Sequence, residues 1–214
     1  MNARGFSIEG SLGYGWSTFR ANMGFFIPLA LITFGVLAVA AIIVGVIAGA
    51  TKGAGASAQI LLQVVQILVL MGWINITLKY TRGESAVYGE LFQPMSQFIS
   101  FLITYVVYGV AVAVGFVLLI VPGIILHLRL QFAPYFLLDQ KCGPIEALQK
   151  SWNATRGSAW SLFGLAVAIW FVNVLGLICL FVGLLATGPT SALAMADVYT
   201  KLRDSAEPLP QAGV

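Results

Sequence analysis

Long stretches without a charged residue alternate with short polar segments along the chain. Uncharged apolar stretches cover residues 25–50, about 58–78, about 98–121 and 160–186. Each is close to or longer than the roughly 20 residues that a helix needs to cross the hydrocarbon of a bilayer. The pattern therefore predicts four full membrane-spanning helices, the second of which ends near Tyr80.

Two shorter apolar stretches predict two further spans. One covers about residues 124–138; it follows Pro122 and Gly123, which are expected to form a tight turn, and Pro134 is expected to bend it. The other covers about residues 191–201, after the sequence TGPT. The predicted fold class is an all-α integral membrane protein with six transmembrane helices.

Polar and apolar positions repeat with helical spacing in three segments outside the spans, residues 1–24, 84–97 and 143–158. In the first, an apolar stripe lies opposite Arg20 and consists of Ile8, Leu12, Trp16, Phe19 and Met23. Such amphipathic helices are typical of a membrane surface. An offset of 136 residues places Leu12, Trp16 and Arg20 on Leu148, Trp152 and Arg156. The simplest organisation is three units, each a surface helix followed by a transmembrane hairpin.

These elements predict one membrane domain over residues 1–214. Its six spans lie within residues 25–203, and a polar tail follows from 204 to 214. Trp16, Trp152 and Trp160 are expected at the level of the lipid head groups, where tryptophan is enriched.

The composition agrees with a bilayer environment. The chain is 59% hydrophobic and 9% charged, whereas a soluble domain carries about 25% charged residues. Its basic residues are too few and too scattered for a nucleic-acid surface. Six spans would place nine of them on the side of the termini, namely Arg4, Arg20, Lys79, Arg82, Lys141, Lys150, Arg156, Lys201 and Arg203, and only Lys52 opposite. This asymmetry predicts that both termini are cytoplasmic.

Few residues are suited to catalysis or metal binding. The single histidine, His127, excludes a cluster of histidine ligands. Cys142 and Cys179 fall in different environments and are expected to be free thiols. We therefore expect no cofactor, no metal and no enzymatic activity. A lipid-modifying enzyme, the alternative in this class, would need Glu146, Ser151, Thr155 and Arg156 at the cytoplasmic face.

Arg129 lies inside the predicted fourth span, where a charge costs about 2.5–3.5 kcal/mol and normally faces protein or water. At 1.5 Å per residue it lies about 9 Å from Gly123, and Asp197 lies about 10 Å from Thr190 at the start of the sixth span. This similar depth predicts an ion pair between Arg129 and Asp197. Binding of an anionic head group or solute, and extension of Arg129 to the outer surface, are the alternatives. His127 and Gln131 lie on another face of the same helix.

Three segments carry a family resemblance, and they read VPGIILHLRLQFAPYFLLDQ, GPIEALQKSWNATRGSAWSLF and GLLATGPTSALAMADVYTKLR. They resemble a group of uncharacterised bacterial integral membrane proteins, similar to the membrane domain fused to some glycerophosphodiester phosphodiesterases. The most specific parts are the Pro-Gly turn, the short arginine-containing helix and a block formed by Glu146, Ala147, Leu148, Ser151, Trp152, Thr155, Arg156 and Gly157. The resemblance implies a six-helix protein of the bacterial inner membrane without an assigned activity.

Two functions are expected from these features. The first is a non-enzymatic accessory or scaffold protein that binds membrane lipids, a membrane-protein partner or further copies of itself. The alternative is a small oligomeric transporter or channel that uses the polar residues Arg129, His127 and Gln131 of the fourth helix and Asp197 of the sixth.

Overall fold

A computed structural model describes residues 6–50, 55–178 and 183–206, and the regular elements of these residues are all helices. The all-α prediction is confirmed for this part of the chain. Lys52, Arg4, Cys179 and the tail from residue 207 onward lie outside the described residues.

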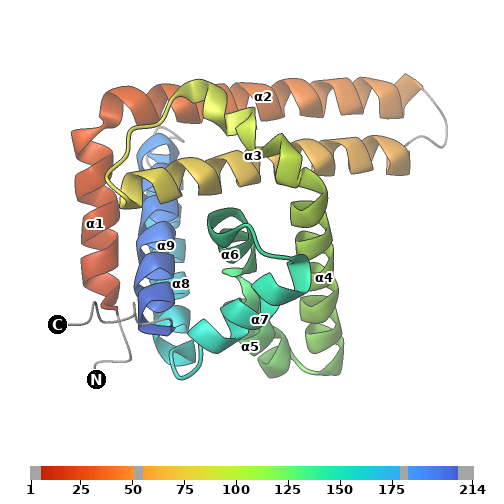
Figure 1. The fold of residues 1–214 in the computed structure, drawn as a ribbon. Coiled ribbons are helices and arrows are strands. Elements are labelled where there is room, and N and C mark those ends of the chain that lie inside the picture. Colours follow the sequence, from red (N-terminus) through yellow and green to blue (C-terminus); the bar gives the residue numbers. More distant parts are fainter. Residues whose placement is uncertain (1–5, 51–54, 179–182, 207–214) are drawn as a thin grey trace.

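The described elements follow one another in the order shown in Figure 1. They are α1 (Ile8–Ala21), α2 (Met23–Ala50), α3 (Gly55–Thr81), the 3₁₀ helix η1 (Tyr88–Gln97), α4 (Phe98–Leu118), α5 (Ile120–Leu130), α6 (Ala133–Gln140), α7 (Pro144–Ala154), α8 (Ala159–Ile178) and α9 (Leu184–Ala206). Within the described residues, five stretches are long and apolar enough to cross a membrane: α2, most of α3, η1 with α4, α5 with α6, and α8.

Three helical hairpins surround the short helix α6 (Figure 1). They are α2–α3, α4–α5 and α8–α9, and they extend in three different directions in this view. A surface segment precedes each hairpin: α1, η1 and α7 respectively. Each of these segments contacts the second helix of another hairpin, because η1 packs on α3, α7 on α5, and α1 on α9. These contacts link the three hairpins into a closed ring.

Small residues allow these contacts. A Cβ atom added at Gly15 of α1 would overlap with the carbonyl oxygen of Thr190 in α9, and one added at Gly72 of α3 would overlap with the backbone of Leu91 in η1. In α7, the hydroxyl of Ser151 donates a hydrogen bond of 2.7 Å to the carbonyl oxygen of Arg129 in α5. All three surface segments therefore lie against the backbone of the helix that they contact.

The fully buried residues of α1 share only Phe19 with the predicted apolar stripe. Ser11, Gly15 and Phe19 are buried, whereas Trp16 is 46% exposed. The same offset of 136 residues places these three buried positions on Ala147, Ser151 and Thr155, which are buried in α7. Helix α1 therefore turns its small residues towards α9 and leaves Trp16, which is predicted to lie at the lipid head groups, on the outer surface.

The turn expected at Pro122 and Gly123 lies elsewhere. The break between α4 and α5 is at Leu119, whose backbone is extended, and Pro122 lies in the first turn of α5, where a proline leaves no intrahelical hydrogen bond unmade. Gly123 permits a close crossing, because an added Cβ would overlap with the ring of Phe116. The predicted interruption near Pro134 is confirmed, since α5 ends at Leu130 and Pro134 opens α6.

The structure does not show a sixth span of residues 191–201. The TGPT sequence lies inside α9, which is a single helix with Pro189 in its second turn. Its mean hydropathy does not place α9 among the helices suited to cross a membrane. Leu193, Ala194, Ala196 and Val198 of this helix are all fully buried. Helix α9 is therefore covered by its neighbours, which explains its weak apolar signal.

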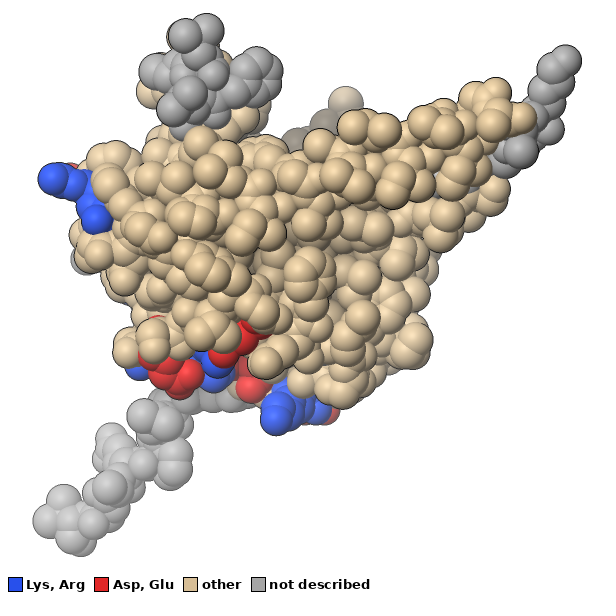
Figure 2. Space-filling model, turned by 90° about the horizontal axis from the view of Figure 1, so that it is seen from above, with Lys and Arg blue, Asp and Glu red and all other residues tan. Residues whose placement is uncertain are grey.

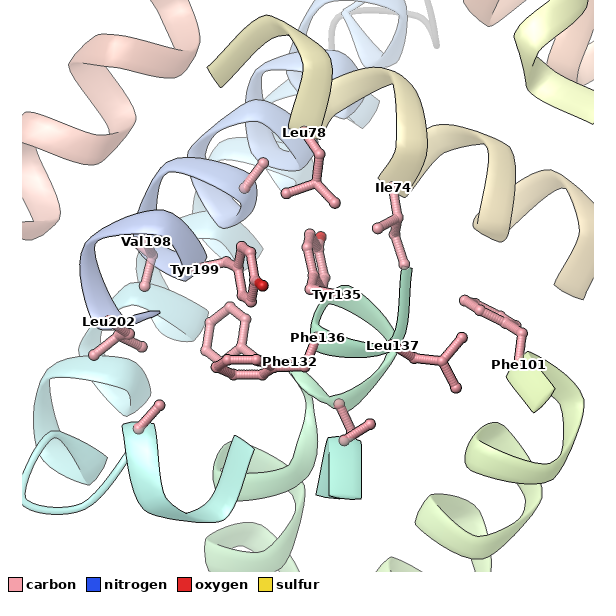
Figure 3. Packing of buried hydrophobic residues seen from close by; sticks show 14 of the residues in the cluster. Ile74, Leu78, Phe101, Phe132, Tyr135, Phe136, Leu137, Val198, Tyr199 and Leu202 are labelled. Carbon is pink, nitrogen blue, oxygen red and sulfur yellow. The ribbon is translucent and has the colours of Figure 1, made fainter. Parts of the chain in front are cut away.

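The main hydrophobic core lies around α6 (Figure 3). Phe132, Tyr135, Phe136 and Leu137 are buried there, and the ring of Phe136 meets the ring of Tyr199 edge-on at 4.9 Å. Helices α3, α4, α5, α7, α8 and α9 contribute the remaining side chains, among them Ile74, Leu78, Phe101, Val198 and Leu202. A second cluster joins α1, α2, α3, η1 and α9 and consists of Phe19, Phe26, Leu29, Ile76, Ala86, Leu91 and Leu193.

Charged side chains are unevenly distributed over the surface. Figure 2 shows most of those visible from this side along one edge of the molecule, next to a wide surface without charges. Such a division is expected for a helical membrane protein, whose charged residues are largely confined to the aqueous boundary.

The packing of α1 on α9 generates a first prediction. Gly15→Ala should lower stability by about 1–3 kcal/mol, the usual cost of inserting a group into a packed contact, and should lower the melting temperature in mild detergent. Gly13→Ala is the matched control, because an added Cβ there would meet no atom within 4 Å and alanine favours a helix by about 1 kcal/mol over glycine. Equal effects of the two changes on the melting temperature would contradict the observed contact.

Candidate functional site

Arg129 and Asp197 have separate partners in the structure. A carboxylate oxygen of Asp197 lies 2.6 Å from the ammonium group of Lys201, one helical turn further along α9. The guanidinium group of Arg129 stacks over the ring of Trp152 in α7, 4.3 Å from its centroid. The expected ion pair between them does not occur among the described residues. The ion pair was expected because Asp197 and Arg129 were placed at a similar depth in the membrane. The depth of Asp197 was counted from Thr190, whereas α9 already begins at Leu184.

Polar residues at the end of α7 bind the backbone of Arg129. Ser151 and Thr155 donate hydrogen bonds of 2.7 and 3.2 Å to its carbonyl oxygen, while Trp152 contacts its side chain. The Nε atom of Arg129 is buried and has no hydrogen-bond partner among the described residues. Arg129 therefore joins the end of α5 to α7, and Ser151, Trp152 and Thr155 of the quoted block form this junction.

His127 and Gln131 belong to other contacts. The Nδ1 atom of His127 lies 2.6 Å from the hydroxyl of Tyr108 in α4. The amide of Gln131 donates a hydrogen bond of 3.2 Å to the carbonyl oxygen of Leu128 in its own helix. The four polar residues expected inside the membrane thus contact different residues, and the structure does not bring them together in one site.

The other residues of the block at residues 146–157 lie in α7 and in the turn that leads to α8. Glu146 and Lys150 form an ion pair of 2.9 Å across one turn of α7, and the hydrogen bond from Lys150 lowers the pKa of the exposed Glu146 carboxyl. Arg156 is exposed at the end of α7. Gly157 follows with a φ of 81°, which favours glycine. Trp160, in the first turn of α8, is 86% exposed, and Arg20 is exposed on α1.

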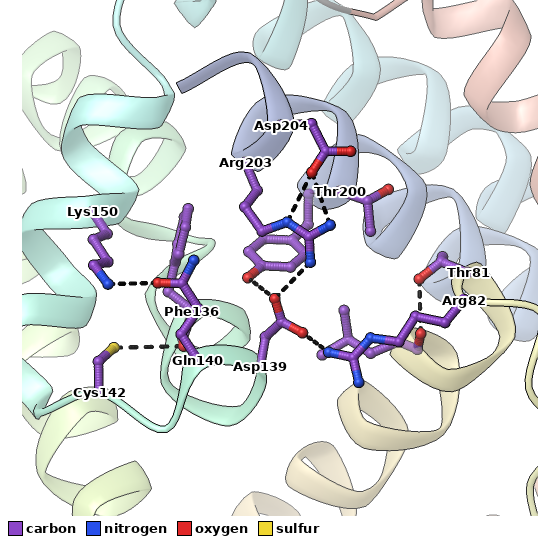
Figure 4. Close-up of polar contacts among 12 residues, drawn as sticks. Thr81, Arg82, Phe136, Asp139, Gln140, Cys142, Lys150, Thr200, Arg203 and Asp204 are labelled. Atoms are coloured by element: carbon purple, nitrogen blue, oxygen red, sulfur yellow. Dashed lines mark hydrogen bonds and ion pairs between the residues drawn. The ribbon is translucent and has the colours of Figure 1, made fainter. Parts of the chain in front are cut away.

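The most extensive charged cluster surrounds Asp139 at the end of α6 (Figure 4). The side chain of Asp139 is only 3% exposed, and its carboxylate forms ion pairs with Arg82, which follows α3, and with Arg203 of α9, the second at 2.9 Å. The hydroxyl of Tyr199 donates a hydrogen bond of 2.6 Å to the same carboxylate. Asp204 also binds Arg203, at 2.8 Å. Two arginines and two aspartates make the cluster electrically neutral.

This Asp139 cluster was missing from the predictions. Asp139 stands just after a predicted span, and its partners come from two helices far away in the sequence, so spacing along the chain does not reveal it. One signal was present: Asp139 is the only acidic residue between Glu90 and Glu146. The geometry is that of a structural tie, because every charge of the cluster has a partner of opposite sign.

Two hollows on the surface differ in the polarity of the side chains that line them. One of about 520 Å³ lies between α1 and the segment after α3 and is lined by polar residues that include Tyr14, Ser17, Asn22 and Glu84. Burial raises the pKa of the Tyr14 phenol, whose hydroxyl donates a hydrogen bond to the carbonyl oxygen of Tyr80. The other, of about 300 Å³, is an apolar groove between α5 and α8.

The described residues contain no group of three or more His, Cys, Asp or Glu side chains that could hold a metal ion. The contacts of the polar residues named above are stacking interactions, ion pairs and hydrogen bonds within the protein. These contacts are suited to holding the helices together.

The family of domains described as a domain of unknown function (DUF7847) matches residues 84–211, more than half of the chain. The chain belongs to this family. The DUF7847 region contains the second and third hairpins, α6, and Asp139, Tyr199 and Arg203 of the charged cluster, whereas Arg82 lies just before it. No curated protein matches the chain. No solved structure matches it either.

The Asp139 cluster generates a second prediction. Asp139→Asn should lower stability on the order of 2 kcal/mol, because two arginines lose their buried counter-charge while both can still reach water. The melting temperature in mild detergent should fall by roughly 4–8 °C. Asp204 is exposed, and Arg203 is the one ion-pair partner of its carboxylate among the described residues. Asp204→Asn should therefore change the melting temperature by less than about 2 °C. A smaller effect at position 139 than at 204 would show that the tie is unimportant.

A double-mutant cycle tests the partners of Arg129. Arg129→Met and Trp152→Leu should be coupled by about 1 kcal/mol, the usual strength of a cation–π contact. Arg129→Met and Asp197→Asn should be additive within about 0.5 kcal/mol, as expected for residues without shared partners. The measurement is reversible thermal or denaturant unfolding in detergent. Coupling of the second pair together with additivity of the first would restore the ion pair expected from the sequence.

Proposed function

We propose that the protein is a non-enzymatic accessory or scaffold protein of the bacterial inner membrane that binds membrane lipid or a membrane-protein partner. The observation that carries the proposal is the contrast between its two kinds of surface. The charged residues of the Asp139 cluster satisfy one another. The apolar helices instead leave open grooves between hairpins, one between α5 and α8 and one, lined by Trp73 and Pro189 among others, between α2, α3 and α9.

A small oligomeric transporter or channel is less well supported. That alternative needs Arg129, His127, Gln131 and Asp197 to line a shared path, and each of them has a separate partner. A protein that transports ions should also give proteoliposomes a flux above that of empty liposomes. We expect no such flux.

Both termini are proposed to face the cytoplasm, which requires α9, a buried helix of 23 residues, to return across the bilayer beside α8. The contacts of Asp139 support this orientation, since they bring the basic ends of α3 and α9 together at one place. Lys150, which contacts Gln140 at the end of α6, adds a third basic segment nearby. A concentration of Lys and Arg on one side is the usual mark of the cytoplasmic face.

Cysteine labelling tests this orientation. In a variant in which Cys142 and Cys179 are replaced by serine, single cysteines at the exposed positions Glu84 and Gln149 should react with a membrane-impermeant maleimide only after the cells are permeabilised. A cysteine in place of Gly53 should react in intact cells. Reaction at position 149 from outside, with none at position 53, would reverse the proposed orientation.

Native mass spectrometry tests the function itself. Protein released from a mild detergent should carry phospholipid or a second protein at a defined ratio, because the open grooves would otherwise leave apolar side chains against detergent. Heat-treated protein provides the background of non-specific adducts. A bare monomer, together with solute flux in proteoliposomes, would refute the scaffold proposal and favour the transporter.

A further inference from the structure

The apolar groove between α5 and α8 is lined by aliphatic and aromatic side chains and by no charged residue. It has a volume of about 300 Å³ and is lined by Val121, Ile124, Ile125, Leu128, Ala159, Trp160 and Phe163. The α5 residues from Val121 to Leu128 extend over about 10 Å along the helix axis. An apolar hollow whose lining follows the helix in this way can accommodate a hydrocarbon chain.

The groove opens on the outer surface of the molecule. Val121 is 65% exposed, and Trp160 and Phe163 are exposed as well. Both walls belong to stretches that are long and apolar enough to cross a membrane. In a bilayer such a surface is covered by lipid chains or by another membrane protein, because water is absent from the hydrocarbon.

The end of the groove formed by α8 is positively charged. Arg156 is exposed three residues before Ala159, and no carboxylate among the described residues pairs with it. No acidic residue occurs from Ala147 to Ala196, and Glu146 is paired with Lys150. The positive end of the α8 helix dipole adds to this field. A negatively charged group is therefore favoured where the groove meets the membrane surface.

We propose that this groove binds one anionic phospholipid, with an acyl chain along α5 and the phosphate group at Arg156 and the start of α8. The exposed indole of Trp160 lies at the boundary between chain and head group, as tryptophans at membrane interfaces do. The proposal rests on the proposed function and specifies which surface takes the lipid and which charge the lipid carries.

A second copy of the protein fits the groove less well. In a two-fold symmetric dimer the same patch occurs on both subunits. Each Arg156 would then face a patch that contains a second Arg156 and no unpaired carboxylate. A lipid phosphate supplies the missing negative charge, and a second copy does not.

The test is native mass spectrometry of the full chain after incubation with vesicles of equal parts phosphatidylglycerol and phosphatidylcholine. The wild-type protein should retain phosphatidylglycerol preferentially. Arg156→Gln should lower its retention about fivefold, the change expected for losing one basic residue near an anionic lipid, and should leave phosphatidylcholine unchanged. Ala159→Phe, which places a ring in the groove, should lower the retention of both lipids.

Two control variants test whether lipid binding depends on this groove or on exposed residues elsewhere. Arg20→Gln removes an exposed arginine from α1, and Ala113→Phe adds a ring to an exposed position of α4; both should retain lipid as the wild type does. Equal losses in the control and groove variants would overturn the site and leave the proposed function standing. Loss of a dimer in Ala159→Phe, with lipid unchanged, would assign the groove to a second copy. A wild-type protein without lipid or partner would refute both proposals.

Discussion

The structure depends on the burial of α6, a helix of eight residues at the centre of three hairpins. Its side chains fill the main core, and its last turn carries Asp139 between Arg82 and Arg203. A buried carboxylate is costly unless cations and hydrogen-bond donors surround it. The ends of α3 and α9 must therefore meet at α6. Hydrophobic packing brings the hairpins together, and this charged contact fixes where two of them end.

The ring of surface segments follows from the same arrangement. The segments α1, η1 and α7 each belong to one hairpin and pack on the second helix of another, so that together they connect all three hairpins. Their contacts require Gly15, Gly72 or Ser151, because only a small side chain lets one backbone approach another so closely. Arg129 belongs to this system as well, since its side chain and carbonyl oxygen hold α7 against α5. The grooves that remain open between hairpins are then available for a ligand.

The sequence predicted those features that depend on local composition. The long apolar helices, the order of surface segment and hairpin, and the break near Pro134 follow from hydrophobicity and helix-breaking residues. The breaks predicted at Pro122 and at TGPT are wrong. Pro122 lies in the first turn of α5, where proline is tolerated, and Pro189 lies inside α9, as proline can in a helix of a membrane protein whose neighbours compensate for the lost hydrogen bond. The partners of Arg129 and Asp139 were not predictable, since they are fixed by contacts between distant helices.

Hydrogen–deuterium exchange of the protein in lipid nanodiscs tests most directly whether the fold is built around α6. The backbone amides of residues 135–140 should be among the slowest to exchange, together with those of the buried half of α9, because both can open only when the hairpins separate. In Asp139→Asn, exchange should become faster in α6 and at the ends of α3 and α9 at the same time. Exchange of α6 as fast as that of the peripheral helix α1, or acceleration confined to α6, would contradict this account.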